Sequence, residues 1–345
     1  MLSLTNVRLT LLAIVAVVCV LQSAAATEPL RVHGLVAATF TPFTESMAIN
    51  PNAVEKQAAW LNKTGVKYVF VSGTTGESVK LTLNERLSQA KLWVELAKKY
   101  GMTTIIHVGA ECLEDAKTMA SNAQSIGADA VGAMPPSFFK PASVEALAAH
   151  MSAIALSAPK LPFYYYHIPS MDGVVFPMYD FVQAMEKTET SNFAGIKYTG
   201  LYQYPGFMDA ARILAYKGGR YEVLSGRDEM MLEALAAGIK GFVGSQFNFV
   251  GDLYNKIRHA FEAMDLDTAR NLQLIAINLL EIEKSAPPTA NAVKYVMGKA
   301  VEDIGPARLP NLPLSAETKA SIDSSFASWC NDLSTADRPQ LCRNA

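Results

Sequence analysis

Lys197 stands near the end of FAGIKYTG (193–200), a segment that otherwise reads as a buried β-strand. Removing an ammonium group from water is unfavourable unless the group is paired or loses its proton. Burial favours the neutral amine, and a neutral amine can attack a carbonyl carbon. Lys197 is therefore a candidate nucleophile, although a lone lysine near the end of a strand is more often simply solvated.

Hydroxyl groups stand near the ends of two other strand-like segments. Tyr166 lies in YYYHIP, where its hydroxyl could relay protons, although a tyrosine in a strand more often packs in the core. SGTTGES at 72–78 offers two hydroxyls and closely spaced backbone amides, which suit a small carboxylate. Glycine and threonine also form ordinary turns. Glu77 in this segment is expected to order the turn.

Two acids and a serine follow the last two strand-like segments or lie within them. SGRDE at 225–229 contains Asp228 and Glu229, and Ser245 lies in the eighth segment. Together they could bind a polyhydroxyl ligand, although both acids could instead cap a helix.

These residues belong to a chain that alternates strand-like and helix-like segments. Eight runs rich in β-branched and aromatic residues are expected to form strands: 34–43, 67–75, 103–110, 128–136, 161–169, 193–199, 221–226 and 240–249. Amphipathic runs expected to form helices between them include 84–101, 113–127, 143–157 and 228–238. This alternation predicts an α/β protein, and eight units predict a closed (β/α)8 TIM barrel. An open doubly wound sheet is the alternative, but no GxGxxG follows the first strand.

Strand alternation places Gly195, Lys197 and Thr199 on the same face of the sixth expected strand. The opposite face is apolar and suits the helix layer. The lysine face is therefore expected to point into the barrel, with Gly195 leaving room beneath the lysine stem. In such barrels the chemistry lies where strands end and loops begin.

Four segments are expected along the chain. They are a secretory signal peptide (1–26), the barrel (27–250), helices packed on it (251–315), and a C-terminal helix with a polar tail (316–345). Residues 11–21 are apolar, follow Arg8 and precede three alanines, which is the pattern of a signal cleaved before Thr27. A retained membrane anchor is the alternative, but the run is short for a span. The pattern predicts a secreted protein, or one in the lumen of the secretory pathway, that is free of the membrane after cleavage.

Export would also allow two cysteines to form a disulfide and one asparagine to be glycosylated. Cys330 and Cys342 border a polar stretch and are expected to form a disulfide in an oxidising compartment, with two reduced thiols as the alternative. Asn62 begins an NKT glycosylation sequon, which has meaning only after export and when exposed.

Charge and histidine patterns argue against several classes of protein. The 345 residues have a formal charge of −2 and no basic footprint for nucleic acid. The five histidines show no HxH or HExxH spacing, and no Walker-type loop is present. No metal and no organic cofactor is therefore expected.

Taken together, the segments resemble the pyruvate-dependent class I aldolases, the family of dihydrodipicolinate synthase and N-acetylneuraminate lyase. The resemblance runs from about Gly34 to about Leu314. GTTGE matches the family's pyruvate-carboxylate loop, and GIKYT matches its Schiff-base strand. YHIP after a run of tyrosines, and GRDE followed by GS, are similar to the N-acetylneuraminate lyase (sialic acid aldolase) branch.

The resemblance implies a role for each candidate residue. Lys197 would form an iminium with the ketone of the substrate, and Tyr166 would move protons and orient the substrate. Thr74 and Thr75 would hold the carboxylate. Thr199 would sit near the hydroxyl that loses its proton when the carbon-carbon bond breaks. The sugar chain would be bound by four residues: Gly226, Asp228, Glu229 and Ser245.

The resemblance also implies the reaction, which is cleavage of N-acetylneuraminate to N-acetylmannosamine and pyruvate by a homotetramer of barrels. A protonated imine suits this cleavage because it is a better electron sink than a carbonyl. The alternatives are another pyruvate-dependent aldolase or a dihydrodipicolinate-type synthase, and a non-catalytic secreted barrel that binds sialic acid. One departure is the loop PPSFFKP, which has Phe138 and Phe139 where many relatives place a tyrosine that reaches across a subunit contact.

Overall fold

The computed structural model describes residues 30–200, 206–287, 289–302 and 304–343. The expected signal peptide, 1–26, lies outside the described residues. Within the described ranges, no helix combines the length and the apolar character needed to cross a membrane.

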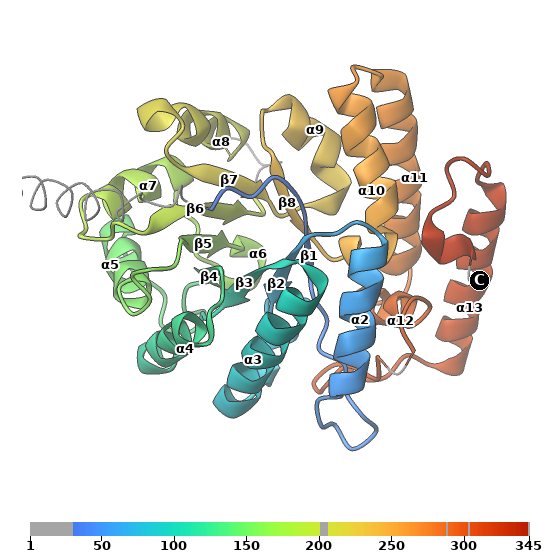
Figure 1. Ribbon diagram of the computed structural model, residues 1–345, viewed down its shortest axis with the longest axis horizontal. Coiled ribbons are helices and arrows are strands. Elements are labelled where there is room, and N and C mark those ends of the chain that lie inside the picture. Colours follow the sequence, from blue (N-terminus) through green and yellow to red (C-terminus); the bar gives the residue numbers. More distant parts are fainter. Residues whose placement is uncertain (1–29, 201–205, 288, 303, 344–345) are drawn as a thin grey trace, which may run out of the picture. The chain divides into compact units, whose positions relative to one another are not determined.

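Eight parallel strands form a closed barrel in which each strand pairs with its neighbours in sequence and the first pairs with the last (Figure 1). The strands are β1 (Gly34–Ala38), β2 (Tyr68–Val71), β3 (Thr103–His107), β4 (Ala130–Ala133), β5 (Phe163–His167), β6 (Phe193–Tyr198), β7 (Glu222–Ser225) and β8 (Gly241–Gly244). The expected TIM barrel is confirmed. The expected runs continue past the observed C-terminal ends because several loop residues there are buried and have the composition of a strand.

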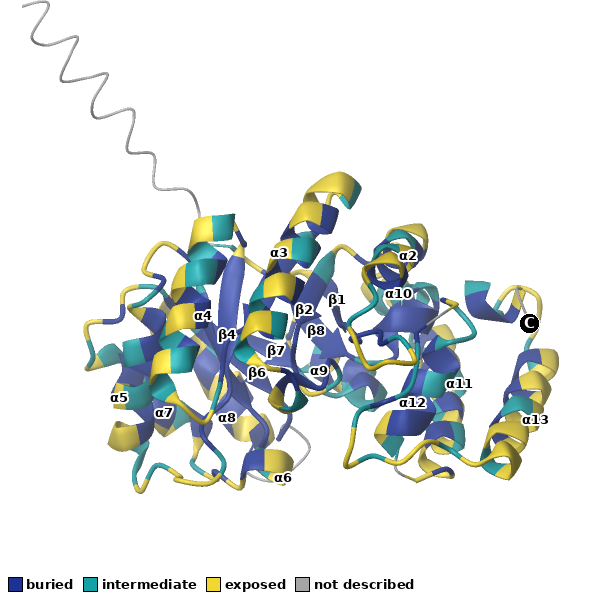
Figure 2. Ribbon diagram, turned by 90° about the horizontal axis from the view of Figure 1, so that it is seen from below, coloured by how far each residue is buried: buried dark blue, intermediate teal, exposed yellow. Residues whose placement is uncertain are grey.

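Helices surround the barrel, and each buries one face and exposes the other (Figure 2). The helices between or directly after the strands are α2 (Pro51–Lys63), α3 (Leu83–Tyr100), α4 (Leu113–Ile126), α5 (Val144–Ala155), α6 (Pro169–Asp172), α7 (Met178–Glu186), α8 (Gly206–Ala215), α9 (Met231–Ala236) and α10 (Phe247–Glu262). The ends of α3 follow from its sequence. Thr82 and Glu85 form a capping box at its start, and Gly101, with a φ of 64°, ends it.

The inside of the barrel is filled at its N-terminal end. The Tyr164 hydroxyl donates a hydrogen bond to Glu222 Oε2 at 2.6 Å, and the backbone N–H of Val32 donates to Glu222 Oε1 at 3.0 Å. All three residues are buried. This end of the barrel is therefore part of a packed core and not of a pore.

Three more helices follow the barrel: α11 (Leu266–Lys284), α12 (Thr289–Met297) and α13 (Ala316–Asp332). Helix α11 packs against α10, and α13 packs against α11. Helix α10, which follows β8 and packs on β1 and α2, spans the barrel boundary expected at residue 250.

The tail is held by the expected disulfide between Cys330 and Cys342, whose Cα atoms lie 5.5 Å apart. The backbone N–H of Gln340 donates to Asp252 of α10 at 2.7 Å, so the closed loop is fastened to the barrel. We expect the double replacement Cys330→Ser and Cys342→Ser to lower the free energy of unfolding by about 3 kcal/mol, because it restores chain entropy to the unfolded state. Urea unfolding of the native and double-serine proteins measures this difference. Equal midpoints would show that the closed tail adds no stability.

Candidate active site

Lys197 lies inside the barrel, on the strand face that the alternation predicts. Its neighbours Ile196 and Tyr198 belong to the apolar core between barrel and helices. Lys197 itself is only 4% exposed. Its Nζ lies 3.8 Å from the ring centre of Tyr166 on β5 and 4.1 Å from that of Phe70 on β2. Two aromatic faces therefore flank the amine.

The apolar surroundings change the protonation of this lysine. Burial lowers the pKa of Lys197 to about 7, while the Asp228 carboxylate acts in the opposite direction. A substantial fraction of the amine is then neutral near pH 7, as a nucleophile requires.

Gly195 has a different role from the one expected. A Cβ atom at this position would lie 2.1 Å from the backbone oxygen of Glu222 on β7. The pairing of β5 with β6 is also irregular just before Gly195, between Phe163 and Tyr164. The space that a side chain would need is thus filled by the neighbouring strand, and glycine allows the two backbones to approach.

Tyr166 connects the amine to the loop after β2. Its hydroxyl lies 3.2 Å from the Oγ1 atom of Thr74. Burial raises the pKa of Tyr166 to about 12, and the hydrogen bond to Thr74 acts in the opposite direction. The phenol is therefore protonated at neutral pH and can donate a proton before it can accept one.

His107 of β3 lies beside this site, with its ring centre 5.9 Å from that of Tyr166, and the sequence reasoning assigned it no role. Its Nδ1–H donates to the backbone oxygen of Ser72 at 2.9 Å, which leaves Nε2 to accept from the backbone N–H of Met134 at 3.3 Å. Burial, followed by the charge of Arg86, lowers the pKa of His107 well below its usual value. A neutral histidine thus fixes the start of the loop that carries Thr74.

A cavity of about 430 Å³ opens beside this loop. Three residues expected in the site line it: Thr74, Thr75 and Ser245. The cavity wall also includes residues of α12, namely Thr289, Ala290, Val293 and Lys294. Lys197 and Tyr166 are not in the wall of this cavity. Thr74 is part of the wall, and its hydroxyl lies 3.2 Å from that of Tyr166.

Asp228 is turned towards β8 and does not cap a helix. Its Oδ2 accepts hydrogen bonds from the backbone N–H of Gln246 at 2.8 Å and from the Ser245 hydroxyl at 3.3 Å. A Cβ atom at Gly244 would lie 1.8 Å from Asp228 Oδ1, so the glycine is required for this packing. Burial raises the pKa of Asp228 to about 6.

The remaining expected residues lie around the ends of β6 and β7. Thr199 is buried, and its hydroxyl donates to the backbone oxygen of His167 at 2.9 Å. A Cβ atom at Gly226 would lie 2.6 Å from Thr199 Cγ2. Glu229 is partly exposed and lies 3.7 Å from the guanidinium of Arg227. These contacts place Thr199 and Gly226 together, while Glu229 lies nearer the surface.

Asp172 is a further acid of this site that the sequence reasoning missed. It lines the same cavity and is 2% exposed. Its Oδ1 accepts a hydrogen bond from the backbone N–H of Val174 at 2.8 Å, whereas Oδ2 has no hydrogen-bond partner among the described residues. Burial raises the pKa of Asp172 to about 6. An acid in YHIPSMD, directly after the fifth strand, was the available signal.

Two further expectations concern metal binding and glycosylation. No group of three His, Cys, Asp or Glu side chains in the described part of the chain is arranged to hold a metal ion. Asn62 is exposed at the end of α2, and its Oδ1 accepts a hydrogen bond from Lys67 at 3.0 Å.

Comparisons with known proteins agree with this geometry. The family described as Dihydrodipicolinate synthetase matches residues 31–327. A Danio rerio protein named N-acetylneuraminate lyase is 37% identical over 306 residues, which cover 88% of this chain and 98% of that protein. The N-acetylneuraminate lyase (sialic acid aldolase) of Aliivibrio salmonicida is 33% identical with a TM-score of 0.82, over 88% of this chain and 99% of that one. A dihydrodipicolinate synthase of Bacillus anthracis is 28% identical with a TM-score of 0.79, over 87% and 99%.

Proposed function

We propose that this chain, which belongs to the dihydrodipicolinate synthetase family, is a Schiff-base aldolase that cleaves N-acetylneuraminate to N-acetylmannosamine and pyruvate. One observation carries the proposal above all. Lys197 is a buried amine with a pKa of about 7, flanked by Tyr166, in a chain 37% identical to a protein named N-acetylneuraminate lyase.

In the proposed reaction, the neutral amine of Lys197 attacks the ketone carbon of the open-chain sugar acid and forms a carbinolamine. Tyr166 is protonated at neutral pH, so it can give its proton to the departing hydroxyl, which leaves as water. The resulting iminium accepts the electron pair of the breaking carbon-carbon bond and becomes an enamine. The phenolate of Tyr166 can then take the proton of the hydroxyl that becomes the aldehyde. Protonation of the enamine carbon and hydrolysis release pyruvate and restore the lysine.

The other residues bind the two ends of the substrate in this proposal. Thr74 and Thr75 hold the carboxylate, and Thr199 lies near the reacting hydroxyl. The sugar chain is held by Gly226, Asp228, Glu229 and Ser245. The unpartnered oxygen of Asp172 adds an acceptor for a hydroxyl or amide N–H of the sugar.

Another pyruvate-dependent aldolase or a dihydrodipicolinate-type synthase is the second candidate, and structural likeness extends to a synthase. A specific observation weighs against the synthase. The loop after β4 exposes Phe138 and Phe139, with ring centres 4.9 Å apart, and so presents no phenol there for a proton relay. A non-catalytic barrel that binds sialic acid is disfavoured by the intact Lys197 and Tyr166.

Product analysis separates these candidates. The purified protein is incubated with N-acetylneuraminate, and pyruvate and N-acetylmannosamine are quantified. In parallel it is given pyruvate with aspartate semialdehyde. We expect equal amounts of the two cleavage products and no condensation with the semialdehyde. Turnover of the semialdehyde alone would favour the synthase. If neither substrate is turned over, a borohydride-trapped adduct with pyruvate would favour another pyruvate-dependent aldolase, and no adduct would favour the binding barrel.

The pH dependence of cleavage should report the lysine. We expect kcat/KM to rise as the pH increases towards 7 and to level off above it, because only the unprotonated amine attacks. Rates measured from about pH 5 to about pH 9 would locate this inflection. A kcat/KM that still rises between about pH 8 and about pH 9 would contradict a buried, perturbed amine.

We further propose that the protein enters the secretory pathway through residues 1–26, is released by cleavage before Thr27, and assembles as a homotetramer. The disulfide between Cys330 and Cys342 and the exposed sequon at Asn62 support export. N-terminal sequencing of the mature protein, its mass with and without glycosidase, and light scattering test the three parts separately. A chain that still begins at Met1 would contradict the cleavage.

A further inference from the structure

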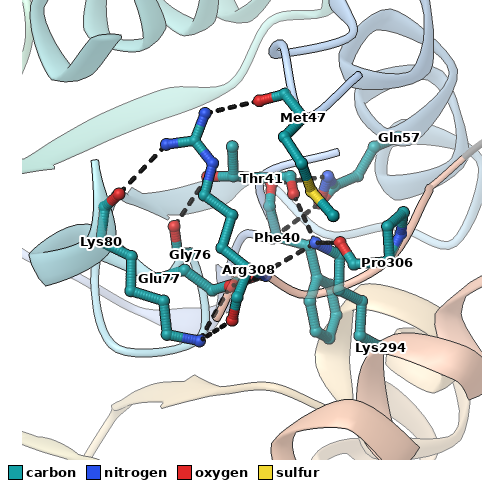
Figure 3. Close-up of polar contacts among 10 residues, drawn as sticks. All are labelled: Phe40, Thr41, Met47, Gln57, Gly76, Glu77, Lys80, Lys294, Pro306 and Arg308. Carbon is teal, nitrogen blue, oxygen red and sulfur yellow. Dashed lines mark hydrogen bonds and ion pairs between the residues drawn. The ribbon is translucent and has the colours of Figure 1, made fainter. Parts of the chain in front are cut away.

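The loop after β2 is joined to α12 by a buried ion pair (Figure 3). Lys294 Nζ lies 2.8 Å from Glu77 Oε1, and the two side chains are 3% and 9% exposed. The other two N–H groups of the ammonium donate to the backbone oxygens of Thr41 and Pro306, each at 2.8 Å. All three N–H donors of Lys294 are therefore used. Lys294 connects the loop to α12, to the segment that contains Pro306, and to Thr41 after β1.

The second oxygen of Glu77 strengthens the same connection. Glu77 Oε2 accepts a hydrogen bond from the backbone N–H of Arg308 at 2.9 Å and one from Lys80 at 3.0 Å. The Arg308 guanidinium in turn contacts Glu85 of α3 at 2.9 Å. Burial alone would raise the pKa of Glu77, but Lys294, Arg308 and Lys80 together hold it below its usual value. Glu77 is therefore a charged carboxylate with cationic or N–H partners on both oxygens.

This network fixes the segment that holds the threonines. Glu77 has a φ of 60°, and its backbone N–H donates to the Thr74 oxygen at 3.0 Å. The Thr41 hydroxyl donates to the Gly76 oxygen at 2.7 Å. Since the Thr74 hydroxyl lies 3.2 Å from that of Tyr166, a displaced Glu77 would change the geometry next to the amine.

The network also has a charge that suits an anion. Three cations, Lys80, Lys294 and Arg308, stand against two carboxylates, Glu77 and Glu85, which leaves one positive charge in excess. Both lysines line the cavity beside the threonine loop. The carboxylates of Glu77 and Asp172 line the same cavity, so the two lysines offset negative charge around a substrate carboxylate held by that loop.

We propose that Glu77, Lys294 and Arg308 are positioning residues for the carboxylate of the bound keto acid. They hold the loop so that its threonine hydroxyls and backbone amides meet the carboxylate without reorganisation on binding. This inference rests on the proposed function, because the carboxylate in question is that of the pyruvyl end. A purely structural network would stabilise the fold and leave carboxylate affinity unchanged.

The test is borohydride trapping of the Schiff base at increasing pyruvate concentrations, with the adduct quantified by intact mass. The single variants are Glu77→Gln and Lys294→Met. We expect each to raise the half-saturating pyruvate concentration about tenfold, while the trapping rate at saturation stays within about threefold of the native rate. Lys294→Arg retains the charge and should fall between Lys294→Met and the native protein.

Two controls make the result specific. Lys299→Met removes a lysine just after the end of α12, where Lys299 pairs with Asp323 and not with the loop. The pyruvate response of this variant should match that of the native protein. Hydroxyacetone, a neutral ketone without a carboxylate, should be trapped equally by native and variant proteins.

The outcomes are distinguishable. Unchanged half-saturation in folded Glu77→Gln, or an equal loss with pyruvate and hydroxyacetone, would overturn the positioning role. Circular dichroism identifies a variant that does not fold. If Lys294→Met is such a variant, Glu77→Gln and Lys294→Arg decide the question. A native protein that forms no adduct with pyruvate would instead refute the proposed function.

Discussion

Replacement of Lys197 by methionine is expected to abolish cleavage of N-acetylneuraminate, with a loss in kcat of at least about 10⁴-fold. Methionine keeps the apolar stem between the rings of Phe70 and Tyr166 but has no amine to form the imine. Without the imine, the breaking carbon-carbon bond lacks its electron sink. Lys197→Arg is expected to be equally inactive, because a guanidinium keeps its proton at every accessible pH.

Trapping with pyruvate and borohydride, followed by peptide mapping, measures this effect directly. The native protein should carry the reduced adduct on the peptide that contains Lys197, and Lys197→Met should carry none. Lys160→Met is the matched control, since Lys160 is exposed on the surface, and it should be labelled like the native protein. Retained cleavage in folded Lys197→Met would refute the mechanism.

Replacement of Tyr166 by phenylalanine is expected to lower kcat by about 10²–10³-fold. The change keeps the ring that lies 3.8 Å from the lysine amine and removes only the hydroxyl that lies 3.2 Å from Thr74. A group with a pKa of about 12 is a proton donor at neutral pH, so its loss should slow the departure of water from the carbinolamine and the later removal of the hydroxyl proton.

Comparison of trapping and turnover identifies the step that Tyr166 serves. The adduct with pyruvate should still form in Tyr166→Phe, although slowly, while cleavage of the sugar acid is lost to a larger extent. Thr74→Val is the companion variant, because it removes the partner hydroxyl and leaves the phenol, and its loss in kcat should be smaller. Native turnover by Tyr166→Phe would mean that another group moves the protons.

The sequence predicts those parts of the molecule that depend on local pattern. Eight strand-like runs predict the barrel because alternation and composition are properties of neighbouring residues. The same alternation places Lys197 on the inner face of β6, beside a tyrosine of the adjacent strand. Thr74, Thr75 and Ser245 line one cavity because the carboxyl ends of parallel strands meet at one mouth.

Other parts depend on contacts between distant segments, which single-sequence patterns do not reveal. Nothing in the local sequence around Lys294 or Arg308 indicates that both reach Glu77, which precedes them by more than two hundred positions. The role of Gly195 was misjudged for the same reason, since the backbone that fills its space belongs to another strand. Asp172 is a partial exception, because its place after the fifth strand is visible in the sequence.

The filled end of the barrel, where Tyr164 donates a hydrogen bond to Glu222, and the covalent bond to Lys197 together bear on the order of events in the proposed reaction. With that end of the barrel filled, reactants and products would enter and leave at the C-terminal end of the strands. The three-carbon fragment is tethered covalently to the lysine in the interior, whereas the aldehyde is released nearer the opening. The sugar must therefore depart first and the keto acid last, and synthesis in reverse must begin with the keto acid.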